Sequence, residues 1–230
     1  MTELLAAAAA FILLHLLVSG TRMRDVLTGR IGQGPYMGLF SLASIGLLVW
    51  LGFAFGKAHA DPANPVYWTA PTAARWVQAG VQLVAVVLAV VGLTTPNPTS
   101  VAQLGVLDKP DAVRGVLRIT RHPFLWGAAL WGLGHLLVNG NLAAIILFGA
   151  IGVLAIAGTF SIDAKRKRVV GAAWDAFAAQ TSNVPFGAVA SGRQSVKFGE
   201  IGWARLVGGV AIWAALLFGH VYMFGVSAKP

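Results

Sequence analysis

The chain has 230 residues, of which 57% are hydrophobic and only 11% are charged, whereas a soluble domain carries about a quarter charged residues. The composition excludes an ordinary soluble domain and predicts an all-α, polytopic membrane helical bundle, formed by residues 1–230 as a single domain. Lys and Arg outnumber Asp and Glu by 17 to 8, and the lack of cysteine excludes disulfides, thiolate metal sites and a cysteine nucleophile.

Six apolar stretches approach the length of about 20 residues that a helix needs to cross a bilayer. The first is predicted to be a retained span and not a signal peptide, because it contains Glu3 near its start and runs into Arg22 and Arg24 without a small-residue cleavage pattern. The predicted spans are about 4–19, 36–56, 76–95, 124–138, 142–162 and 206–226.

The basic residues lie mainly in alternate loops between these spans. Fourteen of the 17 Lys and Arg residues follow the first, third or fifth span, and only 3 lie on the other side. The positive-inside rule then predicts that these loops are cytoplasmic and that both termini lie on the outer, periplasmic side of a bacterial inner membrane. Because topology explains the positive charge, we expect the lipid bilayer and no nucleic acid as a partner.

Two connections between spans have distinct patterns. The sequence Asn-Gly-Asn at 139–141 predicts a tight reversal, which makes the fourth and fifth spans an antiparallel hairpin. After the fifth span, residues 163–180 place Trp174 and Phe177 at helical spacing opposite Lys165. This pattern predicts a cytoplasmic amphipathic helix that lies at the membrane surface.

Three of the five histidines, His15, His135 and His220, lie inside predicted spans. Ionisable residues within a span are rare and usually face a site or the bundle interior. Two imidazoles that face each other across a bundle can serve as axial ligands of a haem iron. Trp131 and Gly134 share a helical face with His135 and favour a planar ligand there. The alternative for each histidine is a purely structural hydrogen bond to a helix carbonyl.

The depth of each histidine helps to choose a pair. At about 1.5 Å per helical residue, His135 and His220 lie roughly 17 Å and 21 Å from the cytoplasmic edge, whereas His15 lies roughly 6 Å from it. The depths favour His135 with His220. The ends of the short first span are not fixed by the sequence, so the pair of His15 and His135 stays open.

The loop before the fourth span ends in Arg121, His122 and Pro123. Proline suits the first turn of a helix, because its missing N–H costs nothing there. Arg121 and His122 are therefore expected at the cytoplasmic interface, where they can bind the phosphate or carboxylate of a cofactor. The alternative is that they act as an interfacial anchor and cap.

Several separated motifs occur in one order along nearly the whole chain. In these motifs the chain resembles NnrU-type membrane proteins. The plant and cyanobacterial zeta-carotene isomerases are related to that family. The motifs are His15 through Arg24, Asp108-Lys109-Pro110, Arg118-Ile119-Thr120-Arg121-His122-Pro123, Trp131-Gly132-Leu133-Gly134-His135, Val184-Pro185-Phe186, Gly192-Arg193-Gln194 and Phe218-Gly219-His220.

The resemblance implies functions that composition and spacing do not. NnrU proteins are associated with the nitrite and nitric oxide reductases of denitrifying bacteria, and the isomerases are haem b proteins that convert one cis double bond of a carotene to trans. The isomerase ligand positions correspond to His15 and His135. A cysteine of the isomerase redox switch corresponds to Gly132, a departure that argues against the same switch here. His220 corresponds to a shared histidine without an assigned role.

The segment Arg121-His122-Pro123, followed by a hairpin of spans, also resembles isoprenylcysteine and phospholipid methyltransferases. Those enzymes bind S-adenosylmethionine and carry a pair of glutamates after the hairpin, whereas this chain has only Asp163 there. The similarity therefore implies a distant fold relationship, with methyl transfer as a minor alternative.

Together these features predict a haem b-binding membrane protein of nitrogen-oxide or redox physiology. If it is an enzyme, the expected reaction is haem-dependent cis–trans isomerisation of a lipophilic polyene. The alternative from another class is a non-enzymatic factor that assembles a respiratory reductase, with 163–180 as its docking surface.

Overall fold

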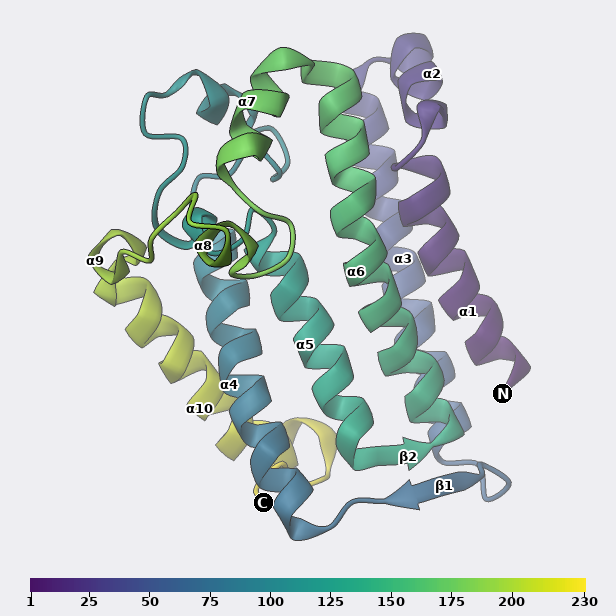
Figure 1. Cartoon of the computed structure of the whole chain (residues 1–230). Helices are drawn as coiled ribbons and strands as arrows, with labels where there is room; N and C mark the ends of the chain where they lie inside the picture. Colours follow the sequence, from purple (N-terminus) through teal and green to yellow (C-terminus); the bar gives the residue numbers. More distant parts are fainter.

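Six helical segments run between the two ends of the molecule in the computed structural model, which describes residues 1–230 (Figure 1). They confirm the all-α prediction, and each overlaps one predicted span. The segments are α1 (Thr2–Leu13) continued by the π-helical turn η1 (Leu14–Val18), α3 (Gln33–His59), α4 (Thr72–Thr94), α5 (Pro123–Val138), α6 (Leu142–Val170) and α10 (Trp203–Phe224).

Four of these segments, α3, α4, α6 and α10, are long and apolar enough to cross a membrane. A fifth span results if α1 and α2 (Arg22–Ile31), which are bent by 76° relative to each other, count as one broken helix. The 16 residues of α5 fall short of the usual span. Both termini nevertheless lie at the same end of the bundle (Figure 1), which requires an even number of passes, so α5 also runs from one end to the other.

The outer helices expose apolar side chains, as expected for a protein surrounded by lipid. Only 11% of the apolar window of α3 and 6% of that of α10 is buried. Leu42 and Phe53 on α3 are 70% and 78% exposed, and Tyr222 on α10 is 90% exposed. An apolar surface of this extent would aggregate in water, so the multi-pass membrane assignment follows from the fold as well as from the composition.

Glycines allow α5 to pack closely against its two neighbours. A Cβ at Gly127 would lie 2.7 Å from the carbonyl oxygen of Ala85 on α4, and a Cβ at Gly132 would lie 2.7 Å from the carbonyl oxygen of Phe148 on α6. Small residues serve this purpose in membrane bundles. The glycine-rich face of α5 is therefore, in part, a helix contact.

The end of the bundle with both termini carries a small antiparallel sheet, and we call it the hairpin end. There β1 (Val66–Thr69) pairs with β2 (Asn139–Asn141), which is the predicted Asn-Gly-Asn reversal between α5 and α6. The side chain of Asn141 accepts a hydrogen bond from the N–H of Ala144 and so caps α6. The reversal is confirmed, while the strand that pairs with it was not predicted.

The opposite end carries most of the basic residues, and we call it the basic end. Its remaining elements are η2 (Leu104–Asp108), η3 (Gly115–Arg118), α7 (Ala172–Gln180), α8 (Gly187–Ala190) and α9 (Phe198–Ile201). These short elements and α2 gather at the same end in Figure 1.

The predicted interfacial helix over 163–180 is wrong. Residues 163–170 continue α6, and the helix breaks at Gly171, where φ is +64°. In α7, Trp174 and Phe177 are 2% and 3% exposed and belong to the core cluster that contains Leu117 of η3. Their helical spacing records burial against protein, which periodicity alone cannot distinguish from burial in lipid.

Candidate functional site

His15 lies in the π-helical turn η1, near the basic end of the first segment. Its Nδ1 lies 2.7 Å from the carbonyl oxygen of Phe11, and its Nε2 lies 3.2 Å from Oγ of Ser44 on α3. Because a carbonyl oxygen only accepts, Nδ1 carries the proton and Nε2 carries the lone pair. The rings of Phe11 and Phe40 lie 4.4 Å and 5.3 Å from the imidazole.

His135 has the same arrangement near the hairpin end of α5. Its Nδ1 lies 2.8 Å from the carbonyl oxygen of Trp131, so Nδ1 is again the protonated nitrogen. Gln82 on α4 donates to the same carbonyl at 3.1 Å. The imidazole is stacked on Phe148 of α6, with ring centroids 4.5 Å apart, and it is tilted against Trp131 at 4.5 Å. No hydrogen bond engages Nε2.

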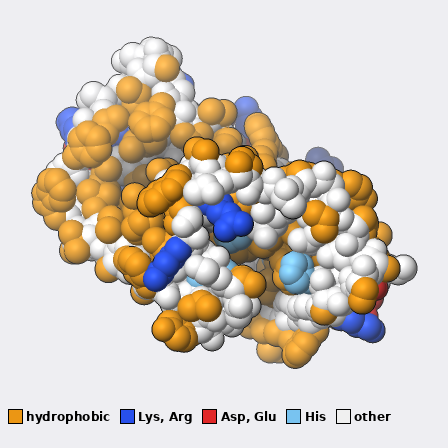
Figure 2. Space-filling model, turned by 90° about the horizontal axis from the view of Figure 1, so that it is seen from below, with side chains coloured by type: hydrophobic (Ala, Val, Ile, Leu, Met, Phe, Trp, Pro, Cys, Tyr) orange, Lys and Arg blue, Asp and Glu red, His pale blue; other side chains and the backbone are white.

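The third histidine lies at the same end of the bundle as the second. His220, near the end of α10, places its Nδ1 2.8 Å from the carbonyl oxygen of Val226, and α10 packs mainly against α4, the helix that also packs against α5. Figure 2, a view of the hairpin end, shows histidine side chains among hydrophobic ones, and His59 at the end of α3 also lies at this end. The structure therefore brings His135 and His220 to the same end of the bundle.

His15 does not share this location. Gly20, five residues after His15, packs against Ser161 of α6, whereas the His135 ring stacks on Phe148. At about 1.5 Å per residue, the two imidazoles differ in depth by roughly 10 Å. The aromatic and polar neighbours of the two rings also lie on different helices.

As single ligands, the histidines fit a haem. A metal-bound imidazole usually donates its other N–H to a carbonyl or carboxylate, and the Nδ1 contacts of His15 and His135 have this form. Two axial ligands must also face each other across the iron. His135 and His220 lie at the same end of the bundle, whereas His15 lies toward the other end.

Gly132 marks the departure from the isomerase pattern. It lies where the backbones of α5 and α6 touch, so a side chain at this position would meet the carbonyl of Phe148 and the N–H of Gly152. A cysteine there would require α6 to move outward. The packing of this chain thus excludes a switch residue at position 132.

The basic end holds a second cluster, built around Asp163 of α6. Arg121 donates from Nε at 2.9 Å and from Nη2 to the two carboxylate oxygens, and His122 Nε2 lies 2.7 Å from Oδ1. Asn183 donates to Oδ2 at 3.0 Å. The guanidinium of Arg121 also lies over the ring of Trp174. All partners of the carboxylate are donors, so this is a nearly dry ion pair with several charge-assisted hydrogen bonds. His122 Nδ1 and Asn183 Oδ1 are buried without a hydrogen-bond partner.

In this geometry Arg121 and His122, which were predicted to bind the anion of a cofactor, already have an anionic partner within the chain. The carboxylate that they bind is that of Asp163, and the His122 side chain is only 1% exposed. Burial lowers the pKa of His122, although Asp163 opposes the shift, so the ring is neutral with its proton on Nε2. Through their hydrogen bonds to Asp163, the two residues hold the start of α5 against α6, where the apolar part of α6 ends.

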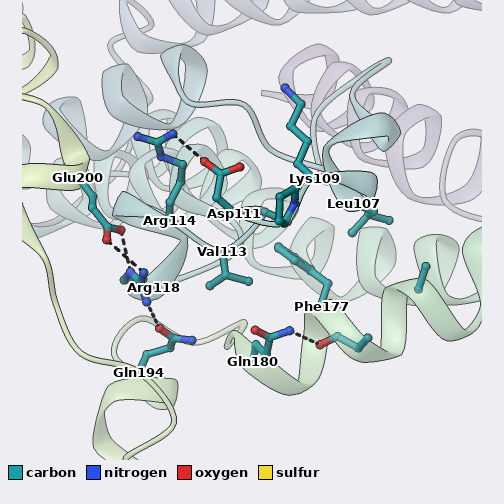
Figure 3. Close-up of a pocket in the computed structure, with 14 residues that line it drawn as sticks. Leu107, Lys109, Asp111, Val113, Arg114, Arg118, Phe177, Gln180, Gln194 and Glu200 are labelled. Carbon is teal, nitrogen blue, oxygen red and sulfur yellow. Dashed lines mark hydrogen bonds and ion pairs between the residues drawn. The ribbon is translucent and has the colours of Figure 1, made fainter.

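Arg118 and Glu200 form a further ion pair beside an open pocket of about 580 Å³ (Figure 3). Arg118 donates to the two oxygens of Glu200 at 2.8 and 3.1 Å and to Gln194 at 2.5 Å. Glu200 also accepts from the N–H of Gly115. These hydrogen bonds join η3, the segment that contains Gln194, and α9.

The Glu200 contacts predict a pH dependence of stability. The hydrogen bond from Arg118, followed by that from Gly115, lowers the pKa of Glu200 to about 2 from an ordinary value of 4.5. Because the folded pKa is depressed, the stabilisation is present above pH 4.5 and disappears as the pH falls toward 2. We expect Glu200→Gln to lower the thermal unfolding temperature in detergent at pH 7 and to converge with the wild type near pH 2.

The control for this experiment is Asp111→Asn, which removes an exposed ion pair with Arg114 and should change stability little at any pH. A Glu200→Gln deficit that stays constant between pH 7 and pH 3 would contradict the assignment.

Sequence reasoning missed the partners of these residues. The partners Asp163, Asn183, Glu200 and Gln82 were not predicted as members of a site, since each pairs with a residue at least 20 positions away. Asp163 and Arg121 are 42 positions apart. One signal was available. With only 8 acidic residues in the chain, an Asp at the end of an apolar span needed a cationic partner.

The chain is similar to one family of known proteins and to two plant enzymes. A family model described as "NnrU protein" matches residues 3–228. A 15-cis-zeta-carotene isomerase of Zea mays chloroplasts is 30% identical over 106 residues, which are 44% of this chain and 28% of that protein. The isomerase of Arabidopsis thaliana is 28% identical over 142 residues, 58% of this chain and 38% of that protein. The similarity thus spans well under half of either relative, and no solved structure matches.

Proposed function

This chain belongs to the NnrU protein family, and from that premise we propose that it is a haem b-binding membrane isomerase that acts on a cis double bond of a lipophilic polyene. The similarity to two 15-cis-zeta-carotene isomerases supports the reaction class. The observation that carries the proposal is the state of His135, whose Nδ1–H is held by the carbonyl of Trp131 while Nε2 makes no hydrogen bond.

The surroundings of His135 suit an apolar, planar ligand. Trp131 and Phe148 flank the imidazole, and the ring centroids of Phe148 and Phe55 of α3 lie 6.1 Å apart. Flat aromatic side chains pack well against a conjugated system. A haem bound there would supply an iron able to act as a Lewis acid or one-electron donor toward a double bond. His135 would hold and orient it, with His220 or His15 as the second ligand, and the aromatic rings would exclude water.

The location of this site agrees with a substrate dissolved in the bilayer. Most of the outward surface of the flanking helices is apolar, so a polyene reaches the bundle from the lipid without crossing water. We propose that the basic end faces the cytoplasm of a bacterial cell, since basic loops are retained on that side.

Reconstitution tests this function directly. The protein, supplied with haem during expression and reduced with dithionite, is placed in liposomes that contain 15-cis-zeta-carotene, and the isomers are separated by chromatography. We expect conversion to the trans isomer above the rate of protein-free liposomes, and no such excess for His135→Ala. If the haem-loaded wild type converts no more than empty liposomes do, the chain is not an isomerase, and a reductase assembly role becomes the account to test.

A further inference from the structure

We propose that the open pocket at the basic end is a binding site for a phosphate-bearing organic molecule, held by Arg118 and Gln194 and attracted by Lys109. The pocket is separate from the proposed haem site. His135 lies near the hairpin end, whereas the pocket lies between η3, α7 and the segments around Lys109 and Gln194. The two proposals can therefore fail independently.

The pocket collects parts of the chain that the isomerase proposal does not use. Lys109, Arg118 and Gln194 belong to three different sequence motifs, yet all three line the same cavity of about 580 Å³. In Figure 3, Arg118 and Gln194 lie on one side of the pocket, and Lys109 rises from the other. Val113 and Phe177 form an apolar wall between them. A cavity of this size accommodates a small organic molecule with a polar and an apolar part.

The charges that line the pocket leave one cation without an acidic partner. Arg114 pairs with Asp111 at 2.9 Å, and Arg118 pairs with Glu200 at 2.8 Å. Lys109 forms no ion pair, so the lining carries a net positive charge. An anion that enters the pocket meets this charge without displacing an existing salt bridge.

Hydrogen-bond donors also remain free in fixed positions. Arg118 has five N–H groups, and its bonds to Glu200 and Gln194 use three of them. Gln194 uses its oxygen to accept from Arg118, which leaves its amide NH₂ group free and fixes its orientation. Donors that are already immobilised lose little entropy when they bind an oxyanion, and phosphate is a preferred partner of arginine.

The side of the pocket with Arg118 and Gln194 also holds an acceptor. Gln180 of α7 donates to the carbonyl of Ala176 at 3.2 Å, and its side-chain oxygen makes no hydrogen bond. The amides of Gln180 and Gln194 lie on the same side of the pocket in Figure 3. A ligand with a hydroxyl or N–H group next to its phosphate is therefore favoured over inorganic phosphate.

The test is a binding titration of the full-length protein in detergent with sn-glycerol 3-phosphate and with inorganic phosphate, followed by calorimetry. We expect saturable binding that is tighter for glycerol phosphate. Lys109→Glu and Gln194→Glu should each weaken it about tenfold, since the first reverses a charge of the pocket lining and the second replaces a free donor by a negative charge. Gln194→Glu keeps the oxygen that supports Arg118, so the fold is preserved.

The matched control is Lys167→Glu, which makes the same charge reversal at the basic end on an exposed lysine outside the pocket, and it should change affinity less than twofold. A parallel arm in nanodiscs compares phosphatidylglycerol with phosphatidylcholine. Competition by phosphatidylglycerol alone identifies a lipid head group as the source of the phosphate. Absence of saturable binding in both arms, or equal losses in the Lys167→Glu control, would overturn the proposal.

Discussion

Replacing Asp163 by asparagine is expected to lower the free energy of unfolding by about 3–5 kcal/mol, the usual cost of removing one partner of a buried ion pair. The carboxylate accepts from Arg121, His122 and Asn183, and the first two side chains are 13% and 1% exposed. An asparagine would turn an NH₂ group toward these donors and leave the guanidinium of Arg121 without its counter-charge.

The control is Asp175→Asn, the same substitution in an exposed ion pair with Lys167, whose side chains are 55% and 69% exposed. Exposed pairs contribute about 0–1 kcal/mol, so this variant should unfold nearly like the wild type. Thermal unfolding in detergent, followed by circular dichroism of the helices, measures both. Equal destabilisation by the two substitutions would show that the cluster around Asp163 does not hold α5 and α6 together.

His135→Ala is expected to abolish haem binding, because His135 belongs to both candidate ligand pairs. The haem content per protein, measured after purification, should fall below about a tenth of the wild-type value, as expected when an axial bond is lost. His59→Ala, at the exposed end of α3, is a matched control and should retain haem.

Two further variants decide the second ligand. Loss of haem in His220→Ala selects the pair that lies together at the hairpin end. Loss in His15→Ala selects the pair implied by the family resemblance. Retention of haem by His135→Ala would refute both pairs.

Hydropathy was sufficient to predict the helical segments, because each must place about 20 apolar residues in lipid. The reversal at 139–141 was also predictable, since three turn-forming residues between two apolar helical segments can only reverse the chain. The bend after η1 was not. At the bend, Gly20 lies so close to Ser161 of α6 that a Cβ would not fit, and these two residues are 141 positions apart in the sequence.

The partners of the candidate site residues could not be predicted from the sequence. The residue types at His135 and Arg121 indicated chemistry, but their partners did not follow from spacing. Arg121 was expected to bind a foreign anion, and it binds Asp163, 42 residues away. The pocket beside Arg118 was not predicted either, because its lining comes from segments between Leu107 and Glu200 that only the fold brings together.

The absorption spectrum of the purified wild-type protein tests the central claim most directly. The protein is expressed with a supply of haem precursor, and spectra are recorded before and after dithionite is added. The account predicts a Soret band that shifts on reduction, together with resolved α and β bands of a six-coordinate haem b. Protein that is folded and free of haem under these conditions would contradict it.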